Sequence, residues 1–282
     1  MFAYFDIGGT KTRVVISMDG NSFADPLKFD TPKNYEEGVD LVVEKILSLT
    51  NGAPIEAAGG GIAGPVDRDH TMLVRSPNLS EWAGKPLVQD LSTKLSCPVY
   101  IRNDSAIVAL GEAHHGAGKG DDIMAYITVS TGVGGSRVVH GVLDVGMYGF
   151  EPGHQFIDFD KSACPECVSP QAEDYLSGTA TAHRFGVKAY EVEDPQVWED
   201  LSRWLAYMLN NTIVHWAPTS VVLGGSMIVG DPAIPVDRVT DHLNEILAIY
   251  PEKPAIKKAA LEDMGGLYGA MEYVRQQVEK FK

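Results

Sequence analysis

Two glycine-rich segments, one in each half of the chain, follow apolar runs that have the length of β-strands. The first, Gly8-Gly9-Thr10-Lys11-Thr12, joins the run Phe2–Ile7 to the run 14–18, and the second, residues 130–136, follows the run Ile123–Val129. A glycine turn between two apolar runs is typical of a β-hairpin. Because the same unit recurs in both halves, we expect an internally duplicated α/β fold built around one polyphosphate, rather than two unrelated hairpins.

The residue types in these turns are compatible with phosphate binding. Glycine lets the backbone approach a phosphate closely, and the hydroxyl of Thr10 can donate a hydrogen bond to it. A plain hairpin explains the glycines equally well. The chain contains neither the Gly-x-x-x-x-Gly-Lys-Ser/Thr pattern of a P-loop nor a Gly-x-Gly-x-x-Gly that opens a helix, so both of these nucleotide sites are disfavoured.

An Asn-Asp pair lies between the two turns. The apolar run 99–102 leads into Asn103 and Asp104, and a helix-like run over residues 106–114 follows. A carboxylate at a strand-to-helix junction meets unpaired N–H groups and the positive end of the helix dipole, which keep it ionised and able to accept a proton. Asp104 is therefore the candidate catalytic base. The alternative is that Asp104 is only the N-cap of the helix.

Composition excludes several other classes. The 282-residue chain has 38 acidic and 23 basic side chains, for a net charge of −15, which disfavours nucleic acid as a partner because phosphate binding needs Lys and Arg. The sequence lacks a run of membrane-spanning length and a targeting pattern at its start, so we expect a cytoplasmic protein without a membrane partner. Three cysteines make no disulfide framework: Cys97 reads as a packed strand residue, and the close pair Cys164 and Cys167 as metal ligands.

Periodicity predicts the main helices. Asn34 and Glu37 form a capping-box pattern that opens a helix, which ends at Asn51-Gly52. Its predicted apolar stripe consists of Val39, Val42, Val43, Ile46 and Leu47. Further apolar runs predict a strand over residues 23–29, a helix around residues 87–95, a strand that ends in two glycines over 219–226, and helices over 197–216, 238–250 and 267–281.

Seven short motifs, taken in order, resemble those of the ROK family of sugar kinases, of the bacterial glucokinase and N-acetylhexosamine kinase type. They are Asp6-Ile-Gly-Gly-Thr-Lys11, Gly61-Ile-Ala-Gly-Pro-Val-Asp67, Ser76-Pro-Asn78, Asn103-Asp104, Thr131-Gly-Val-Gly-Gly135, Glu151-Pro-Gly-His154 and Leu223-Gly-Gly225. The resemblance spans essentially the whole chain. Each motif is weak alone, but the ordered set is specific.

The resemblance implies the two-lobed actin-like ATPase (ribonuclease H-like) fold, an α/β fold with a duplicated mixed β-sheet, in which ATP and a sugar meet in an interdomain cleft. It places a smaller lobe at residues 1–113 plus the C-terminal helix 267–282, and a larger lobe at residues 114–266. It also implies ATP and Mg²⁺ as cofactors and a homodimer as the assembly. ATP is the expected phosphoryl donor, and the acidic surface disfavours polyphosphate.

The resemblance also implies roles for individual residues. Asp104 matches the family's general base, and the positions that bind sugar hydroxyls are Asn78, Asn103, Glu151, His154 and Glu173. The positions that bind the nucleotide are Asp6, which holds magnesium through water, and Gly8, Gly9, Thr10, Lys11, Thr131, Gly132, Gly134, Gly224 and Gly225. The implied reaction is ATP-dependent phosphorylation of a hexose hydroxyl, with the 6-OH of glucose preferred. An N-acetylhexosamine kinase, a fructokinase and, from another class, a non-catalytic sugar sensor are the alternatives.

The chain departs from the family pattern at a structural zinc site. Family members supply one His and three Cys, whereas this chain supplies His154, Cys164 and Cys167 and places Gln171 where the third Cys is expected. Structural zinc normally takes four N or S ligands, so a Zn²⁺ held by these three residues would need a fourth ligand from water, Gln171 or elsewhere. The alternative is that hydrogen bonds and prolines order the loop without metal.

Overall fold

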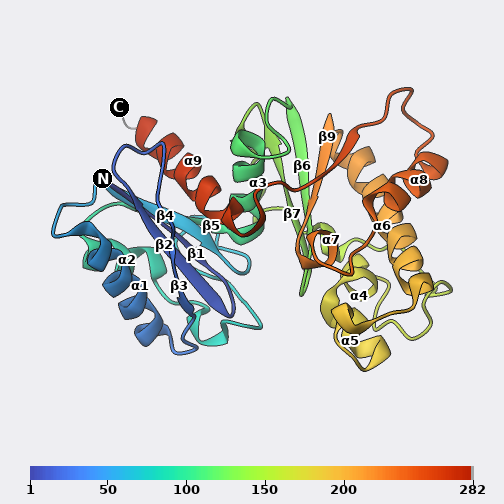
Figure 1. The fold of residues 1–282 in the computed structure, drawn as a ribbon, viewed down its shortest axis with the longest axis horizontal. Helices are drawn as coiled ribbons and strands as arrows, with labels where there is room; N and C mark the ends of the chain where they lie inside the picture. The colour runs from blue at the N-terminus through green and yellow to red at the C-terminus, as the bar shows by residue number, and fades with distance from the viewer. Residues whose placement is uncertain (281–282) are drawn as a thin grey trace. The chain divides into compact units, whose positions relative to one another are not determined.

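The structure is a computed structural model that describes residues 1–280, and its chain forms two compact units. Unit 1 contains residues 1–115, 145–149 and 263 onward, and unit 2 contains residues 116–144 and 150–262. Each unit holds one five-stranded mixed sheet with helices packed on it (Figure 1). Among the described residues, no helix has both the length and the apolar character needed to cross a membrane.

The two sheets have the same topology. The strands of unit 1 are β1 (Phe2–Ile7), β2 (Lys11–Ser17), β3 (Leu27–Asp30), β4 (Ala57–Ile62) and β5 (Val99–Asn103), in the order β3-β2-β1-β4-β5. Those of unit 2 are β6 (Ile123–Val129), β7 (Val133–Val139), β8 (Val142–Leu143), β9 (Ser220–Gly224) and β10 (Ala255–Lys258), in the order β10-β9-β6-β7-β8. In each sheet the first three strands along the chain pair antiparallel, and the last two are added parallel to the first. The predicted duplication is therefore confirmed.

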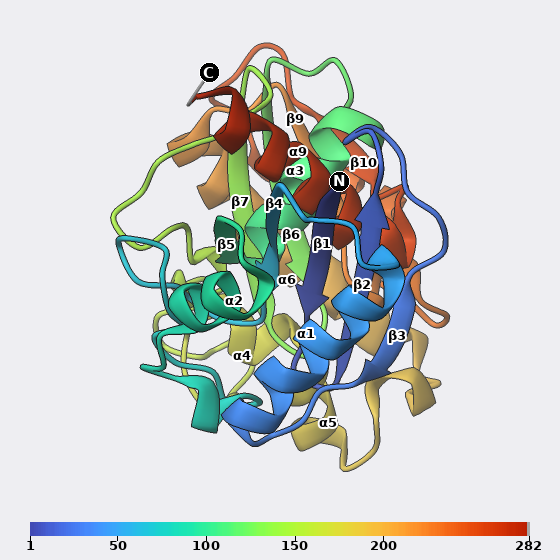
Figure 2. The same cartoon turned by 90° about the vertical axis from the view of Figure 1, so that its left-hand side faces the viewer.

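One face of the unit 1 sheet carries the hydrophobic core. Alternate residues of β1, among them Phe5 and Ile7, are buried against helices α1 (Tyr35–Thr50) and α2 (Leu87–Leu95), which lie together on that face in Figure 2. The side chain of Asn34 caps α1 by accepting a hydrogen bond from the N–H of Glu37 at 3.1 Å, as the sequence predicts. Leu47 was predicted in the buried stripe but is 45% exposed, because it lies at the edge of the buried face that Val39, Val42, Val43 and Ile46 share.

Two helices pack very closely on the other face of this sheet. Helices α3 (Asp104–His115) and α9 (Gly265–Glu279) pack on β4, whose glycines leave room for them. A Cβ on Gly59 would lie 2.7 Å from Val274 Cγ2, and one on Gly61 would lie 3.1 Å from the Cα of Asp104. The glycine run of β4 therefore sets where α3 begins. The predicted C-terminal helix extends over residues 281 and 282, which lie outside the described residues.

In unit 2 the core lies between the sheet and a group of helices. Alternate residues of β6 and β9, including Ile127 and Leu223, pack against this group. The helices of unit 2 are α4 (Ala172–Leu176), α5 (Gly178–Phe185), α6 (Pro195–Trp216), α7 (Ser226–Val229) and α8 (Val236–Ile246). The short 3-10 turns are η1 (Ser80–Trp82) in unit 1, η2 (Pro152–His154) and η3 (Ala189–Glu191) in unit 2, and η4 (Glu262–Met264) at the boundary between the units.

Two predicted elements are shorter than expected. The strand predicted over 23–29 is β3, which starts only at Leu27, because Pro26 lacks the N–H that a ladder hydrogen bond needs. The helix predicted over 238–250 is α8, which ends at Ile246; Pro251 keeps Tyr250 out of a helix but does not account for residues 247–249.

Candidate active site

The β1–β2 turn of unit 1 is held through its carbonyl groups. Thr31 donates hydrogen bonds from its hydroxyl to the Gly8 oxygen at 2.8 Å and from its N–H to the Thr10 oxygen at 2.9 Å. In a trans peptide the carbonyl points opposite to the next N–H. The N–H group of Gly9 therefore points away from Thr31. Lys11, predicted to bind nucleotide, forms an ion pair with Asp30 on β3.

Asp6 lies at the end of β1, directly before this turn. Arg13 Nη1 is 3.5 Å from Asp6 Oδ2, and the same guanidinium also pairs with Asp263. Burial raises the pKa of the Asp6 carboxyl above its ordinary value, whereas the positive charge of Arg13 lowers this pKa and the negative charge of Asp263 raises it. A Cβ on Gly266 would lie 2.9 Å from Asp6 Cγ, so α9 begins tightly against this carboxyl group.

Asp104 is the first residue of α3, and its neighbour Asn103 supplies the capping hydrogen bonds. Asn103 Oδ1 accepts from the N–H groups of Ser105 at 3.0 Å and Ala106 at 3.4 Å, and its Nδ2 donates to the Gly64 oxygen at 2.9 Å. The Asp104 carboxylate accepts from the N–H of Ser105 at 2.8 Å. The carboxylate is thus placed in the first turn of α3, at the positive end of the helix dipole. The side chain of Asn103 therefore uses most of its hydrogen-bonding groups to hold the start of α3, and with it Asp104, in position.

The β6–β7 turn of unit 2 is held by residues of α4 and α5. Glu173 Oε2 accepts a hydrogen bond from the Val133 N–H at 2.7 Å, and a Cβ on Gly132 would lie 2.7 Å from the same oxygen. On the other side of the turn, the Thr179 hydroxyl donates to the Thr131 oxygen at 2.7 Å. The predicted sugar residue Glu173 and the predicted phosphate turn are therefore in direct contact.

The predicted sugar residues Glu151 and His154 flank or belong to η2, and both are exposed. This short turn packs closely on β7, since a Cβ on Gly153 would lie 2.3 Å from the Val133 oxygen. Val133 thus contacts η2 through its carbonyl and Glu173 through its N–H. Asn78, the remaining predicted sugar residue, lies in unit 1 beside the β1–β2 turn, where a Cβ on Gly9 would be 2.5 Å from the Asn78 Cβ.

Glycine is required on steric grounds at the end of β9. Gly225 has φ = +86°, and a Cβ there would lie 2.3 Å from the Val129 carbonyl oxygen. A Cβ on Gly224 would lie 2.4 Å from the Tyr126 hydroxyl oxygen. Gly134, which was grouped with the second turn, instead lies within β7, where it pairs with Thr128.

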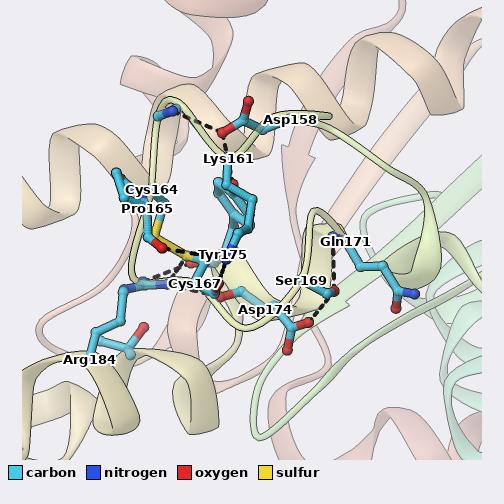
Figure 3. The surroundings of a disulfide bond; sticks show 12 residues. Asp158, Lys161, Cys164, Pro165, Cys167, Ser169, Gln171, Asp174, Tyr175 and Arg184 are labelled. Atoms are coloured by element: carbon cyan, nitrogen blue, oxygen red, sulfur yellow. Dashed lines mark hydrogen bonds between the residues drawn. A yellow bond between two sulfur atoms is a disulfide. The ribbon is translucent and has the colours of Figure 1, made fainter.

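The predicted zinc ligands are not arranged as a metal site. Cys164 and Cys167 form a disulfide (Figure 3), and His154 Nδ1 lies 2.8 Å from Gln171 Oε1. Sulfur atoms bonded to one another are not the thiolates that zinc binds. Within residues 1–280, no group of three or more His, Cys, Asp or Glu side chains is placed to hold a metal. The prediction of thiolate ligands, and of a chain without a disulfide, is therefore wrong for this structure.

Hydrogen bonds to basic side chains order this loop instead. Arg184 Nη1 donates to Cys167 Sγ at 3.2 Å and to the Asp174 oxygen at 2.9 Å, and Lys161 Nζ donates to the Cys167 oxygen at 2.9 Å (Figure 3). Arg184 thereby links the disulfide to α4, which carries Glu173. Sequence reasoning missed Thr31 and Arg184, because no local motif marks a side chain that binds backbone groups of a distant segment.

Comparison with known proteins gives the family. The model of the ROK family matches residues 3–277. A Bacillus subtilis (strain 168) protein provisionally named fructokinase is 30% identical over 241 residues, which cover 81% of this chain and 78% of that protein. The N-acetyl-D-glucosamine kinase of Escherichia coli (strain K12 / DH10B) is 28% identical over 300 residues, which cover 96% of this chain and 98% of that protein. The chain belongs to the ROK family.

A solved structure agrees over the full length. The ROK family glucokinase of Streptomyces griseus, solved in complex with glucose and AMPPNP, superposes with a TM-score of 0.79 at 26% identity, covering 98% of this chain and 99% of that chain. Together with the two mixed sheets, this match confirms the predicted actin-like ATPase fold.

Proposed function

We propose that this protein is an ATP-dependent sugar kinase in which Asp104 is the general base. The observation that carries the proposal is the placement of Asp104 as the first residue of α3, with the adjacent Asn103 capping the helix. A base that accepts the proton of a sugar hydroxyl must be ionised and fixed in position, and the start of a helix provides both conditions. Membership of the ROK family and the likeness to a glucokinase support the same reaction.

The residues present fit a bound nucleotide. The turn at Gly9 and the turn at Gly132 have little room for a side chain, because a Cβ would meet Asn78 in one and Glu173 in the other. Backbone close to a phosphate is what such turns provide. Gly224 and Gly225 would lie beside the nucleoside.

Magnesium fits the same arrangement. Mg²⁺ usually binds one or two carboxylates together with substrate phosphates, and Asp6 is the carboxylate placed directly before the first turn. Bound Mg²⁺ would supply charge compensation on the transferring phosphoryl group. A metal or its water ligands require the ionised form of Asp6, which Arg13 favours and burial disfavours, with burial the larger influence on its pKa.

For the substrate we propose a hexose, with glucose phosphorylated at its 6-OH. Glu151, His154 and Glu173 in unit 2, and Asn78 in unit 1, offer carboxylate, imidazole and amide groups of the kinds that bind sugar hydroxyls. The names of the relatives extend the range to be tested to N-acetylglucosamine and fructose. We also propose a homodimer, as the family resemblance implies.

A coupled assay of ADP release tests the proposal over glucose, fructose, allose, mannose and the N-acetylhexosamines, with Mg²⁺ present and with it chelated. We expect Mg²⁺-dependent turnover with at least one hexose and formation of its phosphate ester by mass spectrometry. Sugar binding without any ester formation would refute the kinase and indicate a sensor.

A further inference from the structure

Lys33 connects the phosphate turn of unit 1 to the loop that carries Asn78. Its Nζ donates one hydrogen bond to the Gly9 carbonyl oxygen and one to the Asn78 carbonyl oxygen, each at 2.8 Å. Lys33 lies between β3 and α1, next to the cap residue Asn34, so its own backbone is anchored by a helix start. Three segments far apart in the sequence therefore meet at one ammonium group.

The two bonds act on backbone groups beside residues that the proposed reaction would use. The Gly9 carbonyl belongs to the same peptide unit as the Thr10 N–H, and in a trans peptide the two point in opposite directions. By holding the oxygen, Lys33 turns the Thr10 N–H away from itself, toward the side on which a phosphate can bind. By holding the Asn78 carbonyl, it fixes the backbone from which the exposed Asn78 side chain extends.

The contact has little freedom to adjust. Gly9 and Asn78 already touch, since a Cβ on Gly9 would lie only 2.5 Å from the Asn78 Cβ. A displacement of either segment is therefore transmitted to the other through packing as well as through Lys33. Hydrogen bonds from a charged donor are stronger than those between neutral groups, so we expect the loss of both Lys33 bonds to change ligand affinity measurably.

We propose that Lys33 is a positioning residue that couples sugar binding at Asn78 to nucleotide binding at the Gly8–Lys11 turn. This inference rests on the proposed function, because it assigns the sugar to Asn78 and the phosphates to the turn. A shift that either ligand causes in its own segment is transmitted through this contact to the other segment, and so changes the site that the second ligand meets. Thermodynamic linkage requires that the sugar and the nucleotide raise each other's affinity by the same factor.

The test compares Lys33→Met, which keeps the length of the side chain but removes its charge and donors, with Lys33→Arg, which keeps both. Lys45→Met, on α1 and paired with Glu44, is the matched control for loss of one positive charge in the same unit. Calorimetry measures the Kd of the best sugar and of a non-hydrolysable ATP analogue, each alone and in the presence of the other. The ratio of the two sugar Kd values is the coupling factor.

We expect Lys33→Met to weaken sugar binding about tenfold and to bring the coupling factor close to one. Lys33→Arg should restore most of the coupling, and Lys45→Met should leave it unchanged. A merely structural role would lower the melting temperature while leaving the coupling factor at its wild-type value, and that result would overturn the inference. Failure of the proposed function would show separately, as absence of turnover in the wild type, while the coupling factor from binding alone still decides the role of Lys33.

Discussion

Glu173 Oε2 accepts a hydrogen bond from the backbone N–H of Val133 at 2.7 Å, so a carboxylate proposed to bind sugar also orders the turn proposed to bind phosphate. This contact of unit 2 corresponds in role to the hydrogen bonds that Lys33 forms in unit 1. In each unit, a residue proposed to bind sugar is therefore in direct contact with the turn proposed to bind phosphate.

Replacing Glu173 should therefore affect both substrates. In Glu173→Ala the Val133 N–H loses its acceptor, and we expect the KM for sugar and the KM for ATP each to rise about tenfold. Glu173→Gln keeps an acceptor oxygen and should raise the ATP KM less than Glu173→Ala does. Steady-state kinetics with Glu193→Gln, an exposed carboxylate of the same unit, as control would check this. An ATP KM unchanged in Glu173→Ala would contradict the structural link.

Replacing the proposed base should affect turnover rather than folding. A positioned general base contributes about 10²–10⁴-fold, so Asp104→Asn should lower kcat by that factor while sugar binding is retained. The amide can still accept the Ser105 N–H, so the melting temperature should change by only about 2 °C. Asp69→Asn replaces an exposed carboxylate of unit 1 and should be neutral in both measurements. Near-normal turnover of Asp104→Asn would remove Asp104 from the mechanism.

Local patterns in the sequence were sufficient to predict the elements around these residues. The cap at Asn34 depends on residues three apart, and each hairpin turn on a few consecutive ones. The contacts of Thr31, Lys33 and Arg184 could not be predicted in this way, because each side chain binds backbone oxygens of a segment that only the fold brings near.

The cysteine pair shows a different limit of the sequence. Two cysteines three residues apart can bind a metal or form a disulfide, and their spacing alone does not distinguish the two. Gln171 at the third ligand position was the informative residue. Its side-chain oxygen lies beside His154 Nδ1, and the two sulfur atoms are bonded to each other.

The disulfide predicts a thiol count. The chain has three cysteines, so denatured protein that has not been reduced should show one reactive thiol, that of Cys97, and reduced protein should show three. In the native state Cys97 should react slowly, because burial raises its pKa to about 11. A colorimetric disulfide reagent measures all three conditions. Three thiols without reduction would refute the disulfide, and the zinc content of that sample would then need to be measured.

The steric requirement for glycine at position 225 predicts that Gly225→Ala loses more stability than Gly52→Ala. Gly52 and Gly225 both have positive φ, of +80° and +86°, but a Cβ at Gly52 meets nothing within 4 Å. Gly52→Ala should therefore cost only the backbone term, about 1 kcal/mol. Gly225, at φ = 86° and ψ = 160°, has a backbone conformation essentially limited to glycine, and a Cβ there also meets the Val129 oxygen, so Gly225→Ala should cost about 3 kcal/mol in all. Urea unfolding measures both free energies, and equal losses would show that the β9–α7 junction can relax.

The hydrogen bonds of the Glu199 carboxylate predict how the stability of the protein depends on pH. Hydrogen bonds from Arg238 and His242 lower the pKa of its carboxyl to about 2, against about 4.3 for an unfolded chain. Because the folded pKa is the lower one, this contribution is fully present above the unfolded pKa and declines as pH falls toward 2. We expect Glu199→Gln to lower the melting temperature by about 2 °C at pH 7. That difference should shrink between pH 5 and pH 3.5, whereas Glu245→Gln, on the same helix as Arg238, should change little at either pH. A difference that grows as the pH falls would reverse the sign and contradict the ion-pair assignment.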